Sequence, residues 1–407
     1  MNIHSQSISG QRILCALLIL FSTLVGCQED PPTPVVDPPI YLCDSLGLGN
    51  LDANRAGGSS FTFVNNPDAP VDYVIECFPR ILVDAKVEPG TVIEFGNDAG
   101  FDIQRDGSFS VVGTVGDTII FRGTNPAKGW WRGIAFNEDD IRNELKYVVI
   151  DGPGGAKLLQ GGLSAGVFNT TASLKMQHTT ISNSLSDGFY NAGIGDLDLF
   201  ANNHFEGNEG FPVTIHANEF HKLDGTGSTY LNNSPNQVRM AISGGSVLTV
   251  TEPQTWKNPG IPVIMDEGVC GIISDLIIEP GFTWYMQADC HVSVDDKGSF
   301  HAVGTAEEPI VIRGSQAIQG FWTGIYLEGT NPLNELTYVT LEHGGRDKPF
   351  GAAAKAANLY LANGVTGLSV SNCSINESGE CGIYKGSAIV SLNNNSYSNN
   401  ADGNVCE

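Results

Sequence analysis

Two runs of neighbouring carboxylates are the residues whose spacing most directly suggests chemistry. They are Glu138, Asp139 and Asp140 in one run and Asp295 and Asp296 in the other. Glycoside hydrolysis requires two carboxyl groups at a defined separation, and calcium prefers clustered oxygen ligands. Turn-forming residues stand beside the second run and the first falls between apolar stretches, so we expect both in solvated loops. The alternative for residues 138–140 is a calcium site, and calcium is the one cofactor that the sequence suggests.

The segment from His216 to His221 gathers two of the eight histidines, with Glu219 between them. It matches neither HExxH nor HxxEH, the motifs of zinc enzymes. A spacing of five places two side chains on opposite sides of a strand, so we do not expect a metal site. No convergent acid and base emerge, and we assign no catalytic residue.

Aromatic side chains are the remaining candidates, because an exposed ring can stack against a sugar. Trp130, Trp256 and Tyr285 are expected at the surface and are our candidate ligand-binding residues. The alternative is that they are single surface aromatics without a role.

The nine cysteines predict disulfides rather than a zinc site, because no Cys-x-x-Cys pair occurs. An exported chain can keep disulfides. Cys270 and Cys290 are expected to pair, since one coil of a solenoid would separate them. Weaker candidates are the pairs Cys373 with Cys381 and Cys43 with Cys77.

The N-terminal segment must be set aside before the fold is considered. Residues 1–26 carry one charged side chain, Arg12, and an apolar run from Ile13 to Val25. That run is too short to span a bilayer as a helix, so it predicts a signal peptide. It ends in Leu24-Val25-Gly26-Cys27, which resembles a lipobox, and Cys27 is therefore the expected lipid-bearing residue. The alternative is an ordinary secretory peptide cut elsewhere.

The residues after Cys27 predict where the chain is anchored. Gln28-Glu29-Asp30 resembles the surface-export signal of Bacteroidetes lipoproteins, which favours the outer membrane and is compatible with its outward-facing leaflet. Residues 28–40 contain Pro pairs and predict an extended spacer. The formal net charge of −24 excludes nucleic acid as a partner, because phosphates would be repelled.

An internal duplication decides the fold class. VEPG at 87–90 recurs as IEPG at 278–281, a shift of 278 − 87 = 191. The same shift maps GSFSVVGT (107–114) onto GSFHAVGT (298–305), TIIFRG (118–123) onto PIVIRG (309–314), WWRGIAF (130–136) onto FWTGIYL (321–327), and NELKYVVI (143–150) onto NELTYVTL (334–341). Trp131 and Trp322 coincide under this shift, so we expect both in the core. Arg122 and Arg313 also coincide, which favours a structural role for both. Further along the shift drifts to 194.

Within each half, short apolar runs alternate with Gly, Asn, Asp or Pro, as in a stack of short strands. Alternation such as Phe101, Ile103 and then Phe109, Val111 predicts strands with one buried face. Coils of about 20 residues would give roughly 15 coils. A coil cannot bury its apolar side alone and must stack on the next one. Tandem β-sandwiches are the alternative, but nothing resembling a linker separates the halves.

The string IEPG…GSFxxVGT…PIxIRG…FWxGIYL…LTYVTLEHGG resembles the right-handed parallel β-helix lipoproteins of bacteria, over nearly all of residues 72–400. The wider fold family includes pectate lyases, polygalacturonases, adhesins and phage tailspikes. The resemblance implies an all-β, single-stranded right-handed parallel β-helix and a carbohydrate-rich neighbourhood, but not a reaction.

These observations predict five segments and one preferred function. The segments are a signal peptide (1–26), a lipidated and Pro-rich tether (27–45), an N-terminal cap (46–71), and two β-helix halves (72–262 and 263–407). The preferred function is non-enzymatic binding of carbohydrate or another surface partner by a lipid-anchored outer-membrane protein. The alternatives are a polysaccharide lyase or glycoside hydrolase acting on acidic polysaccharide, and an adhesive or structural role. A groove lined by Asp with one Arg or Lys would favour the lyase.

Overall fold

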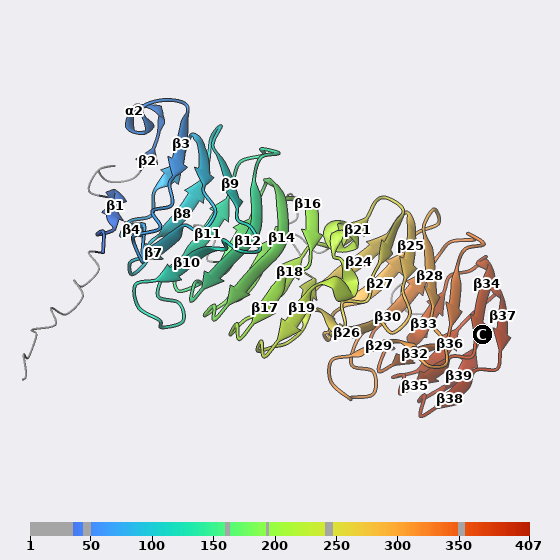
Figure 1. Cartoon of the computed structure of the whole chain (residues 1–407). Helices are drawn as coiled ribbons and strands as arrows, with labels where there is room; N and C mark the ends of the chain where they lie inside the picture. The colour runs from blue at the N-terminus through green and yellow to red at the C-terminus, as the bar shows by residue number, and fades with distance from the viewer. Residues whose placement is uncertain (1–35, 44–49, 159–162, 193–194, 241–246, 349–354) are drawn as a thin grey trace, which may run out of the picture. The chain divides into compact units, whose positions relative to one another are not determined.

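Stacked parallel strands form the body of the protein, as the alternating sequence pattern predicts. The computed structural model describes residues 36–43, 50–158, 163–192, 195–240, 247–348 and 355–407. Every strand pairing within those ranges is parallel. The unit 37–407 is therefore a parallel β-helix, and the tandem sandwiches are excluded (Figure 1).

Four parallel sheets make up the walls of the solenoid. The 14-stranded sheet contains β2 (Asn50–Leu51), β5 (Arg80–Ile81), β8 (Gly100–Ile103), β11 (Gly133–Phe136), β13 (Ala165–Asn169), β15 (Asp187–Asn191), β18 (Val213–Ile215), β20 (Val238–Met240), β23 (Val263–Met265), β26 (Thr283–Met286), β29 (Ile310–Gly314), β32 (Val339–Glu342), β35 (Ser374–Asn376) and β38 (Ser396–Ser398). The 12-stranded sheet contains β1 (Ile40–Tyr41), β3 (Ser60–Phe63), β4 (Tyr73–Ile75), β6 (Asp84–Val87), β7 (Val92–Phe95), β9 (Ser108–Val112), β10 (Ile119–Gly123), β12 (Glu144–Asp151), β14 (Ser173–Ser182), β16 (Asp196–Ala201), β17 (His204–Glu206) and β19 (Thr229–Leu231).

The other two sheets begin at β21 and β22, just before the second half, and run through it. The seven-stranded sheet contains β21 (Val247–Val250), β24 (Val269–Ile272), β27 (His291–Val294), β30 (Gly324–Leu327), β33 (Ala357–Leu361), β36 (Cys381–Tyr384) and β39 (Gly403–Cys406). The six-stranded sheet contains β22 (Gln254–Trp256), β25 (Asp275–Ile278), β28 (Ser299–Val303), β31 (Glu335–Thr337), β34 (Thr366–Ser371) and β37 (Ile389–Asn393). Short helical turns occur at α2 (Ala53–Ala56), η1 (Ala217–Lys222) and η2 (Gly225–Gly227). No helix of the described residues is long and apolar enough to cross a bilayer.

The coils are longer than the sequence pattern predicts. In the 14-stranded sheet, Met265 is in register with Met286, an offset of 286 − 265 = 21, and Glu342 is in register with Asn376, an offset of 376 − 342 = 34. The expected coil length is wrong because loops between strands project from the solenoid and add to the chain without adding strand. Since this sheet has 14 strands, the expected number of coils is nearly correct.

The duplication is visible in the backbone as well as in the sequence. Gly133 and Gly324 occupy equivalent positions and have φ angles of 115° and 119°. A Cβ at Gly133 would lie 2.4 Å from the carbonyl oxygen of Gly166 in the next coil, and one at Gly324 would lie 2.3 Å from that of Ala357. Both the positive φ and the close approach of the next coil therefore require glycine.

Inward side chains form the core that the alternation predicts. Trp131 and Trp322 are fully buried, as expected, and each indole N–H donates to a carbonyl of the following coil, at 2.8 Å, on Asp151 and Glu342 respectively. Phe101 is likewise fully buried. One apolar column thus continues through both halves.

Asparagine at the turns also behaves as the sequence predicts. Asn202 adopts a φ of 55°, a region that Asn tolerates. The neighbouring Asn203 is buried, accepts from the Thr179 amide at 3.1 Å and donates to the Met176 carbonyl at 3.0 Å. These amides bind consecutive coils together at each corner.

Equivalent strands of the two halves lie on different faces of the solenoid, displaced by one face. Under the 191-residue shift β8 corresponds to β27, but the long sheet that contains β8 continues through β20 and β23 into β26, the counterpart of β7. The repeat therefore spans seven coils and one further face. As a result, the same outer surface points to a different side of the solenoid in each half.

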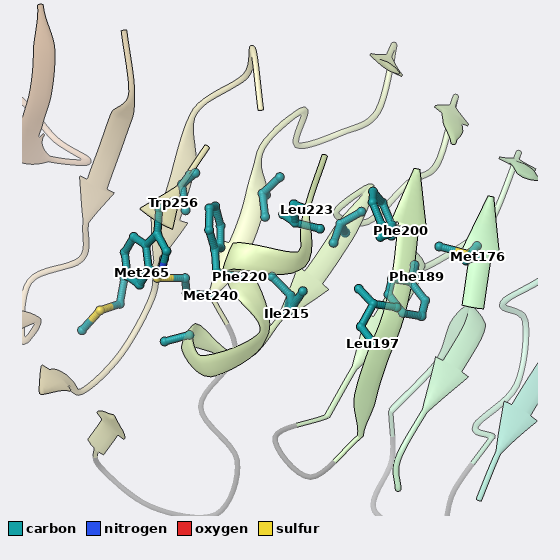
Figure 2. Close-up of a cluster of buried hydrophobic side chains, with 14 of the residues drawn as sticks. Met176, Phe189, Leu197, Phe200, Ile215, Phe220, Leu223, Met240, Trp256 and Met265 are labelled. Atoms are coloured by element: carbon teal, nitrogen blue, oxygen red, sulfur yellow. The ribbon is translucent and has the colours of Figure 1, made fainter. Parts of the chain in front are cut away.

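A short helical turn fills the core at this junction (Figure 2). Phe220 of η1 is fully buried, and its ring centroid lies 5.1 Å from that of Trp256 and 5.8 Å from that of Phe282. Because Phe220 is held in the core, the next residue, His221, is carried toward the outer surface beside β22.

Candidate functional site

A groove of about 530 Å³ lies on the outer surface of the six-stranded sheet, close to the junction. Its floor is made by side chains that alternate with the buried ladder. Ile277 is 43% exposed, whereas Leu276 and Ile278 on either side are buried. In register with Ile277, Thr255 lies on β22 and His301 on β28. The regular alternation of the strands thus brings outward side chains of three coils together.

A carboxylate and an apolar side chain complete the groove. Asp275 is half-buried, and its Oδ1 accepts from the Ser299 hydroxyl at 2.7 Å and from the Asn331 amide at 3.3 Å. Leu333 is 52% exposed and lines the same space. None of the ion pairs among the described residues includes Asp275.

The equivalent place in the first half is occupied by an arginine. Subtracting 191 relates Asp275 to Asp84, Leu333 to Arg142 and Asn331 to Asp140. The Arg142 guanidinium donates to both of those carboxylates, with a distance of 2.8 Å from Nε to Asp140. This contact lowers the pKa of Asp140. The second half keeps an aspartate, Asp275, in place of Asp84 and has leucine in place of Arg142. The groove lies at this place.

Two histidines border the groove. Nδ1 of His301 lies 3.7 Å from a carboxylate oxygen of Glu335, so its charge can be paired when it is protonated. Nδ1 of His221 is buried and has no hydrogen-bond partner among the described residues. The other histidine of the HxxxxH segment, His216, accepts from the Asn218 amide and caps η1 instead. The sequence pattern does not predict that His221 borders a groove.

Of the three aromatic side chains predicted to be exposed for stacking, the prediction for Trp256 is wrong. This side chain is fully buried, because it is in register with the inward-facing Ile278, and its indole N–H donates to Gln254 at 2.7 Å. Trp130 is partly buried against the core and donates to the Thr124 hydroxyl at 3.0 Å. Tyr285 does point outward, between Ile264 and Arg313 of the long sheet, and its role as a ligand contact stays a prediction.

A different aromatic ladder faces outward on the seven-stranded sheet. The ring centroids of Tyr326 and Tyr360 are 5.1 Å apart, and those of Tyr360 and Tyr384 are 4.9 Å apart. Because these rings stack on one another, their faces are covered and their edges point outward. Sugar rings bind to exposed aromatic faces, so this ladder is better suited to joining coils than to binding a sugar.

The predicted carboxylate runs do not form a site. Asp139 accepts from the amide and hydroxyl of Ser173, at 3.2 and 2.6 Å, while Asp140 is paired with Arg142. Across the described residues, no three His, Cys, Asp or Glu side chains are grouped so that they could hold a metal ion. The calcium alternative for Glu138, Asp139 and Asp140 is therefore not supported by the geometry.

The contacts of the second acidic run and of the repeated arginines agree with a structural role. Asp295 and Asp296 lie in a turn, where the Asp295 carboxylate accepts from the Lys297 amide at 3.3 Å. Arg122 lies 2.8 Å from Glu94, and Arg313 lies 3.9 Å from Glu342. Each arginine therefore pairs with an acid on a neighbouring coil.

Arg239, on the outer face of the long sheet, is another arginine that lies between two aspartates. Arg239 lies 2.9 Å from Asp187 and 3.8 Å from Asp266, and its guanidinium lies over the rings of Phe211 and Tyr190. Burial raises the pKa of Asp187. Asp187 also accepts from the Thr214 hydroxyl and the Phe211 amide, at 2.6 and 3.0 Å. These contacts saturate the carboxylate, which favours a structural role.

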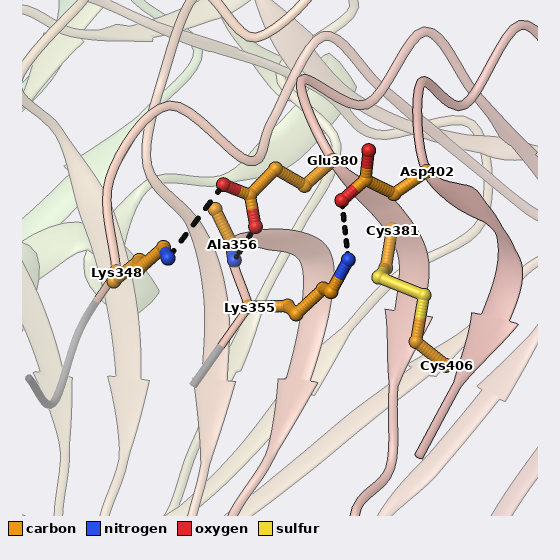
Figure 3. Close-up of a disulfide and its surroundings, with 7 residues drawn as sticks. All are labelled: Lys348, Lys355, Ala356, Glu380, Cys381, Asp402 and Cys406. Atoms are coloured by element: carbon orange, nitrogen blue, oxygen red, sulfur yellow. Dashed lines mark hydrogen bonds and ion pairs between the residues drawn. A yellow bond between two sulfur atoms is a disulfide. The ribbon is translucent and has the colours of Figure 1, made fainter. Parts of the chain in front are cut away.

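The cysteine predictions are partly wrong. Cys43 pairs with Cys77, as one of the weaker candidates predicts, but Cys270 and Cys290 are both free and buried. Cys381 pairs with Cys406, not with Cys373 (Figure 3). Spacing along the chain misled because Cys270 and Cys290 both point into the core, where one replaces Pro79 and the other Ala99 under the shift. Burial raises the pKa of both thiols to about 12.

Comparison with known proteins adds no family, since no family model, no curated protein and no solved structure matches this chain. The predicted lipidation residue Cys27 lies outside the described residues. One signal for the groove was present in the sequence. The 191-residue shift aligns Leu333 with Arg142 and Ile277 with Lys86, so two cations of one half become apolar in the other.

Proposed function

We propose that this protein is a lipid-anchored binding protein of the bacterial outer membrane, and that the groove on β22, β25 and β28 holds its ligand. The supporting observation is that the groove exists where the duplicated surface of the first half carries Arg142. Its apolar and polar walls suit a partner that presents both kinds of group. Among the described residues, no Trp, Tyr or Phe lines the groove, which favours a protein partner over a sugar.

A display experiment tests this assignment. The full chain is immobilised and probed with a glycan array and with a random peptide library displayed on phage. We expect at least one probe to bind the wild type and to be lost with Leu333→Arg, which restores the first-half residue and fills the groove. Ile318→Arg is the matched control, because Ile318 is also 52% exposed but does not line the groove. Probes that bind both variants equally would place the ligand elsewhere.

The competing function is a lyase or hydrolase acting on acidic polysaccharide. Two observations favour it: the groove is lined by an aspartate and a lysine, Asp275 and Lys257, and Arg239 pairs with Asp187 and Asp266. Acidic polysaccharides are incubated with the protein and calcium, and unsaturated products or new reducing ends are followed. We expect neither, because Asp187 is saturated and Asp275 is the one carboxylate among the described residues that line the groove. Turnover by the wild type that Asp266→Asn abolishes would overturn the binding function.

A further inference from the structure

The internal repeat shows what is missing from the groove. In the first half a carboxylate, Asp84, receives the guanidinium of Arg142. In the second half the carboxylate is kept as Asp275, its serine partner is kept as Ser299 in place of Ser108, and the arginine becomes Leu333. The acceptor side of the ion pair is therefore present without its donor.

The electrostatics of Asp275 favour a cation from outside the chain. Its hydrogen-bond partners are neutral, the Ser299 hydroxyl and the Asn331 amide. A half-buried carboxylate with neutral partners can accept a charge-assisted hydrogen bond from an incoming cation, which is stronger than a neutral one. In the first half Asp140 shares the arginine, whereas its counterpart Asn331 carries no charge. One positive charge is therefore sufficient to pair with Asp275.

The other side chains that line the groove indicate what kind of group should carry that charge. Ile277 and Leu333 can contact an aliphatic stem, as long basic side chains bury their methylene groups along apolar surfaces. Asp275 begins β25, while Lys257 directly follows the neighbouring β22, so opposite charges stand at opposite ends of Ile277. A peptide can match both ends, with a basic side chain at Asp275 and a main-chain carbonyl at Lys257.

We propose that the groove recognises an arginine side chain on an extended segment of a protein partner, with its guanidinium at Asp275 in the way that Arg142 meets Asp84. This proposal rests on the proposed function, since it names the group that the groove binds. Arginine is preferred over lysine because its planar guanidinium can donate to the carboxylate through two N–H groups at once.

Calorimetric titration of the full chain tests the proposal with two peptides, acetyl-Leu-Arg-Leu-amide and the same peptide with citrulline, a neutral isostere, in place of arginine. We expect the arginine peptide to bind about tenfold more tightly, about 1.4 kcal/mol. Asp275→Asn should remove that difference and leave the citrulline peptide unaffected. Asp296→Asn is the matched control, because it removes one charge from an exposed turn outside the groove.

The outcomes separate this proposal from the function on which it rests. Equal binding of the two peptides, unchanged binding by Asp275→Asn, or no binding of the arginine peptide would each overturn the arginine assignment. The display experiment tests separately whether the groove is a ligand-binding site. If Leu333→Arg abolishes a displayed ligand while the arginine peptide fails, the groove is a binding site for another chemistry. A glycan as that ligand would identify a sugar as the partner.

Discussion

The same outer position of the coil serves opposite purposes in the two halves of this chain. At Arg142 the first half closes its surface with an ion pair to Asp84, and at Leu333 the second half leaves a groove beside Asp275. The backbone beside the two positions is alike, because Glu144 is in register with Ser110 in the first half as Glu335 is with His301 in the second. The difference therefore arises from a few outward side chains, which a solenoid can exchange without disturbing the inward ladder.

The comparison extends to the cores and the ends. All three free thiols of the described residues belong to the second half, whereas a disulfide joins adjacent coils near each end of the chain, at Cys43–Cys77 and Cys381–Cys406. Each disulfide thus links one of the outermost described coils to its neighbour.

The largest expected effect tests whether the two cores are equally packed. Trp131→Ala and Trp322→Ala should each cost about 3–5 kcal/mol, since each removes a fully buried ring. Trp131 should cost more, because it stacks on Phe95 at 4.2 Å and position 286, the counterpart of 95, is methionine. Denaturant unfolding checks this order. A smaller loss for Trp131 would mean that the second half carries the main core.

The next effect compares the two ends. Cys77→Ser and Cys406→Ser should each cost about 2–4 kcal/mol, because the disulfides join positions separated by 34 and 25 along the chain. The loss should be local in a solenoid. Hydrogen exchange is therefore expected to rise in the first coils for one variant and in the last coils for the other. Uniform loss of protection along the chain would contradict independent ends.

A smaller effect concerns pH and separates the second half from the first. Burial raises the pKa of Cys373 to about 11 and those of Cys270 and Cys290 to about 12, from an ordinary value of 9.0. The folded state keeps these protons when the unfolded state has lost them. Stability is then unaffected below pH 9 and falls above it, by up to about 1.4 kcal/mol per thiol per pH unit.

Alkaline unfolding of the triple Ala variant of those cysteines measures this loss. The variant should be less stable at neutral pH, because it leaves cavities, but its stability should decline less between pH 9 and 11. Iodoacetamide labelling at pH 8 should spare the three thiols in the folded protein and reach them after denaturation. Rapid labelling of the folded protein would show that they are accessible.

The smallest expected change in stability gives the sharpest comparison of the surfaces. The double variant Lys86→Ile with Arg142→Leu gives the first half the two apolar groove residues of the second, Ile277 and Leu333. Its stability should fall by only about 0.5–1 kcal/mol, because the ion pairs lost are exposed. If the arginine proposal is correct, calorimetry should find a second binding site for acetyl-Leu-Arg-Leu-amide. An unchanged stoichiometry would show that these positions are not sufficient to make the site.

The sequence by itself determined the repeated coil. A constant offset between the two halves and an alternation such as Phe109 with Val111 can be satisfied only if like coils stack, because each coil leaves an apolar side that its neighbour must cover. The core positions of Trp131 and Trp322 follow from the same offset. These features are local and periodic, and therefore readable along the chain.

Tertiary structure alone decided how distant residues meet. The repeat spans seven coils and one face, so the copies are rotated relative to one another, and that rotation depends on how η1 and the strands β20 to β23 pair at the junction. Tertiary structure likewise brought Cys381 to Cys406 and His221 to the groove. Which coil a side chain faces is set by the lengths of the loops between strands, and these loops follow no period.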